Sequence, residues 1–231
     1  MATQETALIV GAGHGLSAAL ARLFLREGMR VALASRSAAK IDADILAAGA
    51  RACRCDASHP ADVSELFLRV ESEFGTPDLV VYNASHRMRG PLVELDPAGV
   101  ERSLMVSCYG GFLVAQQAAK RMLARGRGTI LFTGASASVK GYAQSAPFAM
   151  GKFGLRGLAQ SMARELAPQN IHVAHFVIDG GIAGPGHPGE ERGPDSMLRP
   201  EAIAETYLHI HRQHRSAWTW EVELRPWVEK F

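Results

Sequence analysis

A glycine-rich stretch near the start of the chain has the composition of a phosphate-binding loop. The segment IVGAGHGLSAAL places Gly11, Gly13 and Gly15 directly after an apolar run and before a helical pattern. Gly11 permits a tight turn, and the other two let the backbone approach a pyrophosphate, whose charge the N–H groups and dipole of a helix start would meet. Because strand, glycines and helix follow in this order, the segment predicts a dinucleotide-binding loop.

The end of the second apolar run, ASRS, indicates which dinucleotide is bound. A free ribose 2′-hydroxyl is usually met by an acidic residue at this place, and this chain has none. Ser35 and Arg36 instead offer a hydroxyl and a planar cation that suit a 2′-phosphate. The sequence therefore favours NADP(H) over NAD(H). The alternative is an exposed Arg36 without a ligand, because arginines at strand ends are commonly exposed.

These residues need a scaffold that brings strand ends together. Short apolar runs alternate with amphipathic stretches, which implies a parallel sheet covered by helices on both faces. We expect a single Rossmann-like, doubly wound α/β domain over residues 1–231, with about seven strands at residues 6–10, 30–35, 50–55, 78–82, 128–133, 171–178 and 218–224. Apolar stripes at helical spacing predict helices between the strands, including two long ones near residues 98–124 and 147–167.

One connection is too long for an ordinary loop. Residues 179–200, DGGIAGPGHPGEERGPDSMLRP, are dense in glycine and proline. Long loops of this kind often close over a bound molecule. We therefore expect a substrate-binding lid within the single domain.

Composition and charge exclude several function classes. Apolar residues make up 47% of the chain and the formal net charge is only +2, so nothing indicates disorder or a nucleic-acid footprint. The nearest approach to a basic cluster is Arg121, Arg125 and Arg127, which we expect to form a solvated helix end. The expected partner is a small-molecule substrate, with no nucleic acid and no membrane.

Cysteines and histidines give no sign of a metal site. Cys53, Cys55 and Cys108 are odd in number and form no C-x-x-C pair. The histidines near residues 209–214 do not have the spacing that puts two ligands on one helix face. The first residues resemble neither a signal peptide nor a membrane span. We expect a cytoplasmic protein without a metal.

Taken in order, these motifs resemble those of the short-chain dehydrogenase/reductase superfamily. Its loop T-G-x-x-x-G-x-G corresponds to the segment that begins at Gly11, with Ser17 in the place of the third glycine. The segments CDAS (55–58), YNAS (82–85) and VIDGGI (177–182) resemble its later motifs. The resemblance implies further cofactor contacts at Leu16, Asp56, Ala57, Asn83, Ala84, Ser85, Gly180 and Ile182, and at His14, where members that prefer NADP often carry a base.

In that family a tyrosine exchanges a proton with the substrate, and a lysine four residues later lowers the pKa of the tyrosine and binds the nicotinamide ribose. Lys152 matches the lysine, but the tyrosine position holds Phe148, which has no proton to give. Phe148 keeps the packing of the ring. Lys152 is then a ribose-binding residue, or in the alternative reading a solvated helix lysine.

The other two catalytic positions also differ. A serine that orients the substrate is expected at residue 135, which is alanine, although Ser136 and Ser138 lie close by. An asparagine that holds a water in the proton relay is replaced by Ser107. Tyr109 and Tyr142 are candidates for a substitute acid, with packing as the alternative for each.

Two hypotheses follow. The first is an NADP(H)-dependent oxidoreductase of atypical mechanism that acts on a small carbonyl or enoyl substrate. The second is a cofactor-binding protein without catalysis, a sensor or partner subunit, because residues that act as one proton-transfer unit fail together. The chain also resembles a subgroup with an incomplete glycine motif and no active-site tyrosine. The resemblance further implies a homodimer or homotetramer formed through helices 98–124 and 147–167.

Overall fold

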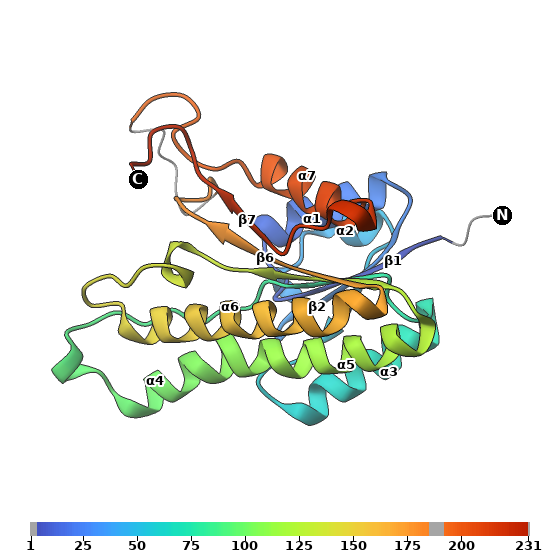
Figure 1. Ribbon diagram of the computed structural model, residues 1–231, viewed down its shortest axis with the longest axis horizontal. Helices are drawn as coiled ribbons and strands as arrows, with labels where there is room; N and C mark the ends of the chain where they lie inside the picture. The colour runs from blue at the N-terminus through green and yellow to red at the C-terminus, as the bar shows by residue number, and fades with distance from the viewer. Residues whose placement is uncertain (1–3, 185–191, 231) are drawn as a thin grey trace.

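A single parallel sheet forms the centre of the molecule. The computed structural model describes residues 4–184 and 192–230, and within them seven strands pair in the order β3-β2-β1-β4-β5-β6-β7, all parallel (Figure 1). The strands are β1 (Thr6–Val10), β2 (Arg30–Ser35), β3 (Arg51–Arg54), β4 (Leu79–Tyr82), β5 (Gly128–Thr133), β6 (Ile171–Ile178) and β7 (Glu221–Leu224). The predicted doubly wound α/β fold is confirmed.

Helices cover both faces of the sheet (Figure 1). One face carries α1 (Leu16–Arg26), α2 (Ala43–Ala47) and α7 (Pro200–His211). The other face carries α3 (Pro60–Phe74), α5 (Gly110–Arg125) and α6 (Ala146–Leu166), with α4 (Pro97–Leu104) leading into α5. The carboxyl ends of the strands therefore meet at one edge, between the two helical layers, where α/β proteins bind their ligands.

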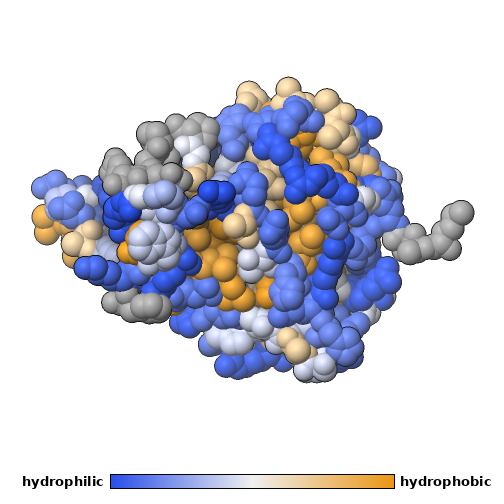
Figure 2. Space-filling model, turned by 90° about the horizontal axis from the view of Figure 1, so that it is seen from above, coloured by the Kyte–Doolittle hydropathy of each residue, from blue (hydrophilic) through white to orange (hydrophobic). Residues whose placement is uncertain are grey.

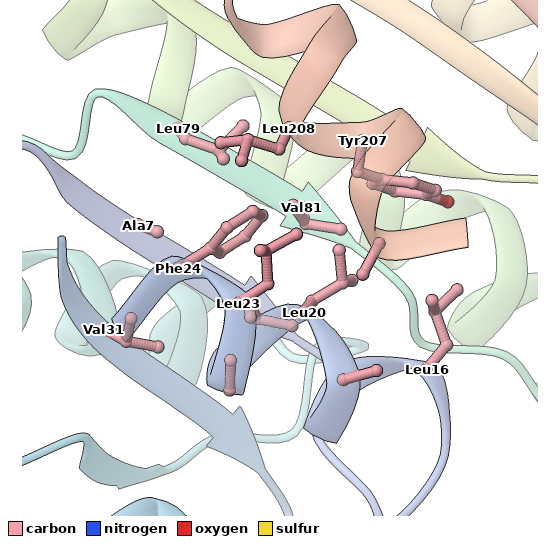
Figure 3. Close-up of a cluster of buried hydrophobic side chains, with 14 of the residues drawn as sticks. Ala7, Leu16, Leu20, Leu23, Phe24, Val31, Leu79, Val81, Tyr207 and Leu208 are labelled. Atoms are coloured by element: carbon pink, nitrogen blue, oxygen red, sulfur yellow. The ribbon is translucent and has the colours of Figure 1, made fainter. Parts of the chain in front are cut away.

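Helix α1 shows how the apolar pattern builds one of the two cores. Its apolar side chains recur at helical spacing, and Leu20 and Phe24 are fully buried against the sheet. From the other side of the same layer, Tyr207 of α7 stacks on Phe176 with ring centroids 3.6 Å apart. Figure 3 shows α1 and α7 converging on β1 and β4 in this cluster. Truncating Phe24 to alanine would cost about 3–5 kcal/mol of stability.

The long helix expected near residues 98–124 runs from Pro97 to Arg125 and contains a π-helical turn. Helix α4 passes without a break into η3 (Met105–Tyr109), which is π-helical, and then into α5. A π turn inserts an extra residue into an α-helix and often marks a functional site. The sequence analysis predicted one continuous α-helix here and did not predict the π turn.

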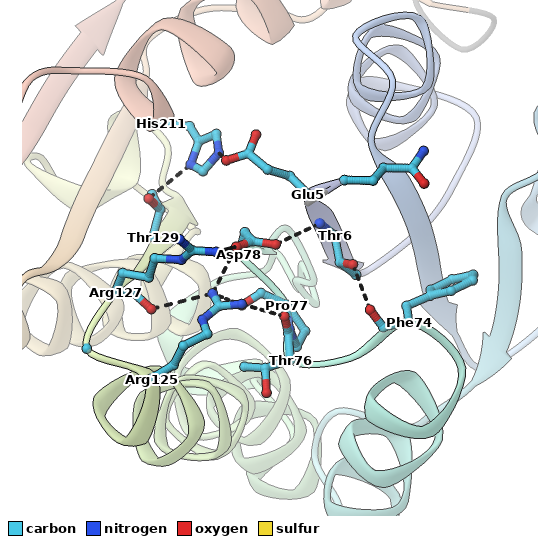
Figure 4. Close-up of polar contacts among 12 residues, drawn as sticks. Glu5, Thr6, Phe74, Thr76, Pro77, Asp78, Arg125, Arg127, Thr129 and His211 are labelled. Atoms are coloured by element: carbon cyan, nitrogen blue, oxygen red, sulfur yellow. Dashed lines mark hydrogen bonds and ion pairs between the residues drawn. The ribbon is translucent and has the colours of Figure 1, made fainter. Parts of the chain in front are cut away.

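The amino-terminal edge of the sheet is closed by ion pairs (Figure 4). Arg125 donates to the carbonyl oxygen of Thr76 at 2.9 Å and lies 3.1 Å from the Asp78 carboxylate. The side chain of Arg127 is 60% exposed, but those of Arg121 and Arg125 are only 16% and 26% exposed. The expected solvated helix end was therefore wrong for both: Arg121 is held by Glu71 of α3 and by Gln117 of its own helix, and Arg125 by the loop before β4.

The last strand is shorter than predicted. It begins at Glu221 rather than at residue 218, because the preceding residues bond to a turn. Trp218 donates from its indole nitrogen to the carbonyl oxygen of Gln213 at 3.1 Å, and the backbone N–H of Thr219 donates to the Gln213 side chain at 2.9 Å. The third strand covers 51–54 rather than 50–55.

The segment predicted as a lid lies only partly within the described structure. Residues 185–191 fall outside it. On either side, Ala183 donates to the carbonyl oxygen of Leu198 at 2.8 Å, and Leu198 donates to that of Gly181 at 2.9 Å. The two ends of the segment are thus paired with each other. Its role as a lid stays a prediction.

Figure 2 shows the face that carries α1 and α7, where apolar residues lie between polar ones. Among the described residues, none of the helices combines the length and the apolar character needed to cross a membrane.

Candidate active site

The glycine loop after β1 has the shape of an anion cradle. Gly11 has a φ of +96°, and a Cβ atom there would lie 2.3 Å from the backbone nitrogen of Ala84, so a larger residue is excluded. At Gly13 and Gly15 a Cβ atom would meet nothing within 4 Å, which leaves the backbone open to a ligand. Helix α1 starts directly after Gly15 with no side-chain cap and no acidic residue in its first turn. Its free N–H groups and positive dipole end suit a phosphate.

Ser17 gives the departure from the third glycine a structural role. Its hydroxyl donates to the carbonyl oxygen of Gly11 at 2.9 Å and accepts a hydrogen bond from the side-chain amide of Asn83 at 2.7 Å. Ser17 is 2% exposed. The serine therefore ties the turn after β1 to the end of β4, across the carboxyl edge of the sheet.

Two adjoining cavities follow this edge and share Gly11, Asn83 and Ser85. One, of about 210 Å³, lies at the ends of β1, β2 and β4, and the other, of about 370 Å³, extends from the glycine loop to residues 182–184. Together their linings include all the predicted cofactor residues except His14, Lys152 and Gly180. The predicted contacts thus come together in one trough of a size that suits a dinucleotide.

The smaller cavity has a positively charged end. Ser35 and Arg36 line it as predicted, and Lys40 joins them from the short 3₁₀ turn η1 (Ala38–Lys40). Asp56 lines the same cavity, and its carboxylate accepts hydrogen bonds from the hydroxyl and the backbone N–H of Ser58. Burial alone would raise the pKa of Asp56, but the bonds from Ser58 together with the charges of His59 and Arg36 lower it.

His14 points to a different partner. Its ring nitrogen Nδ1 contacts the carboxylate of Asp42, which also pairs with Arg22 at 2.7 Å. His14 lines neither cavity of the trough. His14 and Arg22 thus both contact the Asp42 carboxylate near the glycine loop, and Arg22 also pairs with Asp44 at 2.8 Å.

Lys152 lies beneath the floor of the site. Its side chain is 3% exposed, and its Nζ atom donates to the carbonyl oxygen of Thr133 at 2.7 Å. Burial lowers the pKa of Lys152 to about 8. The alternative reading of a solvated lysine is therefore wrong, because α6 turns this side chain inward against the end of β5.

Phe148 lies between two cations. The Nζ atom of Lys152 is 5.7 Å from the centroid of its ring, and the guanidinium carbon of Arg87 is 5.1 Å from the same centroid. Both distances are in the range of cation–π contacts. The place where the resemblance implies a phenol hydroxyl is thus an apolar ring flanked by positive charge.

Ser107 lies in the π turn and hydrogen-bonds to the loop that follows β4. It is fully buried, its hydroxyl accepts a hydrogen bond from the backbone N–H of His86 at 3.1 Å, and a Cβ atom on Gly151 would lie 2.7 Å from its Cβ atom. Ser103 donates to the carbonyl oxygen of His86 at 2.9 Å. These two serines fix the start of the loop that follows β4.

The serines after β5 have separate partners. The hydroxyl of Ser138 accepts a hydrogen bond from the backbone N–H of Ala135 and is fully buried, so it closes the turn. Ser136 is partly exposed and hydrogen-bonds to Asp179. Burial would raise the pKa of Asp179, but the bond from Ser136 and the charge of Lys140 lower it. Of the two serines, only Ser136 is partly exposed.

The comparisons with known proteins name the fold. The family model of short chain dehydrogenases matches residues 5–183. The chain belongs to this family. A short-chain dehydrogenase/reductase from Armillaria gallica is 31% identical over 181 residues, which cover 75% of this chain and 69% of that protein.

Solved short-chain dehydrogenases match nearly the whole chain. One from Rhodopseudomonas palustris is 35% identical with a TM-score of 0.82, and the match covers 96% of this chain and 99% of that one. A metagenomic short-chain oxidoreductase, solved in complex with NADP, is 28% identical with a TM-score of 0.82 over 96% of this chain and 97% of that one. The agreement extends beyond residue 183, into the part that follows the family match.

Both candidate tyrosines lie partly at the surface of the described structure. Tyr142 is 47% exposed, and the Nζ atom of Lys140 lies 5.9 Å from its ring centroid. Tyr109 is 37% exposed and stacks on Phe112 along the helix surface, with centroids 6.0 Å apart. Tyr142 is the closer of the two to the groups around Ser136, because Lys140 contacts both Tyr142 and Asp179.

Sequence reasoning missed three residues that this short-chain dehydrogenase brings to the site. Lys40 follows the end of β2 by five positions, and Arg87 follows Ser85 by two. Their closeness to predicted site residues in the sequence was the available signal for both. Asp179 stands where the resembling motif A-P-G-x-V has proline. A departure from the motif was the available signal for Asp179, whereas nothing in the spacing predicts that Arg87 contacts Phe148.

Proposed function

We propose that this chain is an NADP(H)-dependent oxidoreductase that acts on a small carbonyl or enoyl compound without a tyrosine at position 148. The observation that carries the proposal is the trough with Ser35, Arg36 and Lys40 at one end. Two cations and a hydroxyl match the charge and the geometry of a 2′-phosphate. The complex of a similar oxidoreductase with NADP supports the same reading.

Different residues of the chain would bind different parts of this cofactor. The glycine loop and the start of α1 would bind the pyrophosphate. Lys152 would bind the nicotinamide ribose, which requires it to exchange its bond to the carbonyl of Thr133 for ribose hydroxyls. When bound, the nicotinamide supplies or accepts a hydride.

The proton has to come from a group other than residue 148. Ser136 is the hydroxyl that best fits this role. Asp179 orients it, and Lys140 lies 3.4 Å from Asp179. A water, or Tyr142 acting through its contact with Lys140, would complete the transfer. A water would be a weaker acid than a phenol tuned by an adjacent lysine.

A second candidate function is cofactor binding without catalysis, as a sensor or partner subunit. Phe148 favours it, because its ring carries no proton and covers Lys152. Tight NADPH binding with no turnover across a broad carbonyl panel would support this candidate. Measurable NADPH oxidation by the wild type would exclude it.

A binding titration tests the cofactor half of the proposal. NADPH and NADH are titrated against the wild type, Arg36→Ala and Lys40→Ala, with Arg26→Ala, an exposed arginine at the end of α1, as the control. Each of the first two variants should weaken NADPH binding about tenfold or more and leave NADH binding nearly unchanged. Equal loss for both dinucleotides would contradict the NADP preference.

A further inference from the structure

The loop after β4 carries a guanidinium to the ring of Phe148. Arg87 comes two residues after Ser85, which lines both cavities of the trough. Its guanidinium carbon lies 5.1 Å from the centroid of the Phe148 ring. The cation therefore stands beside the trough, at the residue where the family's proton donor is expected.

Backbone hydrogen bonds fix the loop on both sides of Arg87. On one side, the backbone N–H and carbonyl of His86 bond to the buried hydroxyls of Ser107 and Ser103. On the other side, Gly90 donates to the carbonyl oxygen of Gln144 at 3.0 Å, in the loop that leads into α6. Arg87 is thus held in place before any ligand arrives, which lowers the entropy that binding must overcome.

Within the described part of the chain, no carboxylate pairs with the guanidinium of Arg87. Within residues 4–184 and 192–230, neither Arg87 nor Arg89 forms an ion pair. The nearby carboxylate of Asp96 accepts hydrogen bonds from the backbone N–H groups of Ala98 and Gly99 instead. Burial, followed by the like charge of Arg89, lowers the pKa of Arg87. Both side chains are exposed to solvent, and two like charges near each other make this part of the loop attractive to an anion.

We infer that Arg87, assisted by Arg89, binds an oxyanion group of the substrate, a carboxylate or a phosphate, over the ring of Phe148. A planar guanidinium with two parallel N–H donors matches such groups. The apolar ring gives the rest of the substrate a surface to pack against. The substrate class is therefore an anionic carbonyl or enoyl compound.

The inference rests on the proposed function in one respect, namely that the space beside Phe148 is where a substrate lies. It does not require turnover. An anionic substrate would also explain why residue 148 is phenylalanine. A phenol tuned toward its anionic form would repel a substrate anion at this place, whereas a phenyl ring does not.

Binding of small aromatic probes tests the inference. Benzoate, phenyl phosphate and the neutral benzamide are titrated calorimetrically at fixed ionic strength, with and without NADPH. The wild type should bind at least one of the two anions about tenfold more tightly than benzamide. Arg87→Ala should lose this preference, and Arg87→Lys should keep part of it, because a lysine retains the charge but not the paired donors. The preferred anion then identifies the group as carboxylate or phosphate.

Two controls separate this site from others. Arg164→Ala removes an exposed arginine at the far end of α6, and Arg36→Ala removes the cation at the proposed 2′-phosphate site. Both should keep the preference for the anion. Its survival in Arg87→Ala, its loss in Arg36→Ala, or its absence from the wild type would overturn the inference. Because the probes need no cofactor, a failed NADPH titration would count against the proposed function alone.

Discussion

The Nζ atom of Lys152 lies 2.7 Å from the carbonyl oxygen of Thr133, in surroundings that leave the lysine 3% exposed. A charged ammonium group in such a place has lost most of its water. The carbonyl supplies one hydrogen bond in return. The neutral form is therefore much more accessible to this lysine than to one on the surface.

The burial of Lys152 predicts a particular dependence of stability on pH. The pKa falls from 10.5 in the unfolded chain to about 8 in the folded protein. Between pH 8 and 10.5, unfolding of the protein is therefore coupled to the uptake of one proton by this lysine. Below pH 8 the lysine is charged in the folded protein, and the destabilisation by its buried charge is complete. Stability of the cofactor-free wild type should rise relative to Lys152→Met through this window, by up to about 3 kcal/mol. Urea unfolding of both proteins at several pH values measures the difference, and parallel pH profiles would show that the lysine is not buried in solution.

Restoring the missing hydroxyl should raise activity. Phe148→Tyr places a phenol next to Lys152, and a positioned general acid contributes about 10²–10⁴-fold to such reactions. NADPH oxidation with a panel of carbonyl compounds should therefore increase about 100-fold or more over the wild type. Phe153→Tyr, on the exposed side of the same helix, is the matched control and should have no effect. An unchanged rate in Phe148→Tyr would mean that another part of the site limits turnover.

Ser17 should contribute measurably to stability. Ser17→Ala removes the bonds to the carbonyl of Gly11 and to the amide of Asn83, and leaves both groups buried. The expected loss is about 1–3 kcal/mol in the free energy of unfolding. Ser161→Ala, on the exposed face of α6, should change it by less than about 0.5 kcal/mol. If the two variants are equally stable, the hydroxyl of Ser17 bonds to water instead.

The outer faces of α5 and α6 predict self-association. Phe112 and Leu123 on α5 and Met150 and Phe153 on α6 are each 38–51% exposed, and apolar patches of this kind mark interfaces. Light scattering should give two or four times the chain mass of 24.8 kDa. Phe112→Glu combined with Phe153→Glu should yield monomers.

The control for this experiment is Leu68→Glu, which changes a leucine on α3 that is 60% exposed. It should leave the oligomer intact. A wild type that is monomeric at all concentrations tested would contradict the prediction.

The fold and the cofactor trough were predictable from the sequence because both depend on local patterns. Apolar runs and glycine spacing are set by neighbours along the chain, so β1, the glycine loop and α1 were predicted close to where they lie. The contact between Arg87 and Phe148 joins residues 61 positions apart, since 148 − 87 = 61. This contact depends on how the loop after β4 and the start of α6 are placed in the folded protein. The periodicity of the sequence does not predict that placement.

The burial of Lys152 could not be predicted from the sequence either. A lysine on a helix is exposed by default, and only the packing of α6 against the end of β5 reverses this. Arg125 differs from expectation for a related reason, because the carbonyl groups that bind it belong to the loop before β4. In both cases the neighbours that decide the environment come from distant parts of the sequence.

The π turn at Met105–Tyr109 sets how this protein tolerates insertions and deletions. Before the turn, Ser103 faces His86, and after it, Gly110 faces the sheet so closely that a Cβ atom would lie 2.5 Å from the hydroxyl of Tyr82. The π turn already absorbs one residue more than an α-helical turn holds, so loss of one residue there would close it into a continuous α-helix and keep both halves in place. One further residue would instead rotate one half of the helix against the other by about 100°, and either the loop that bears Arg87 or the contact with Tyr82 would be lost, so this helix should tolerate a deletion here better than an insertion.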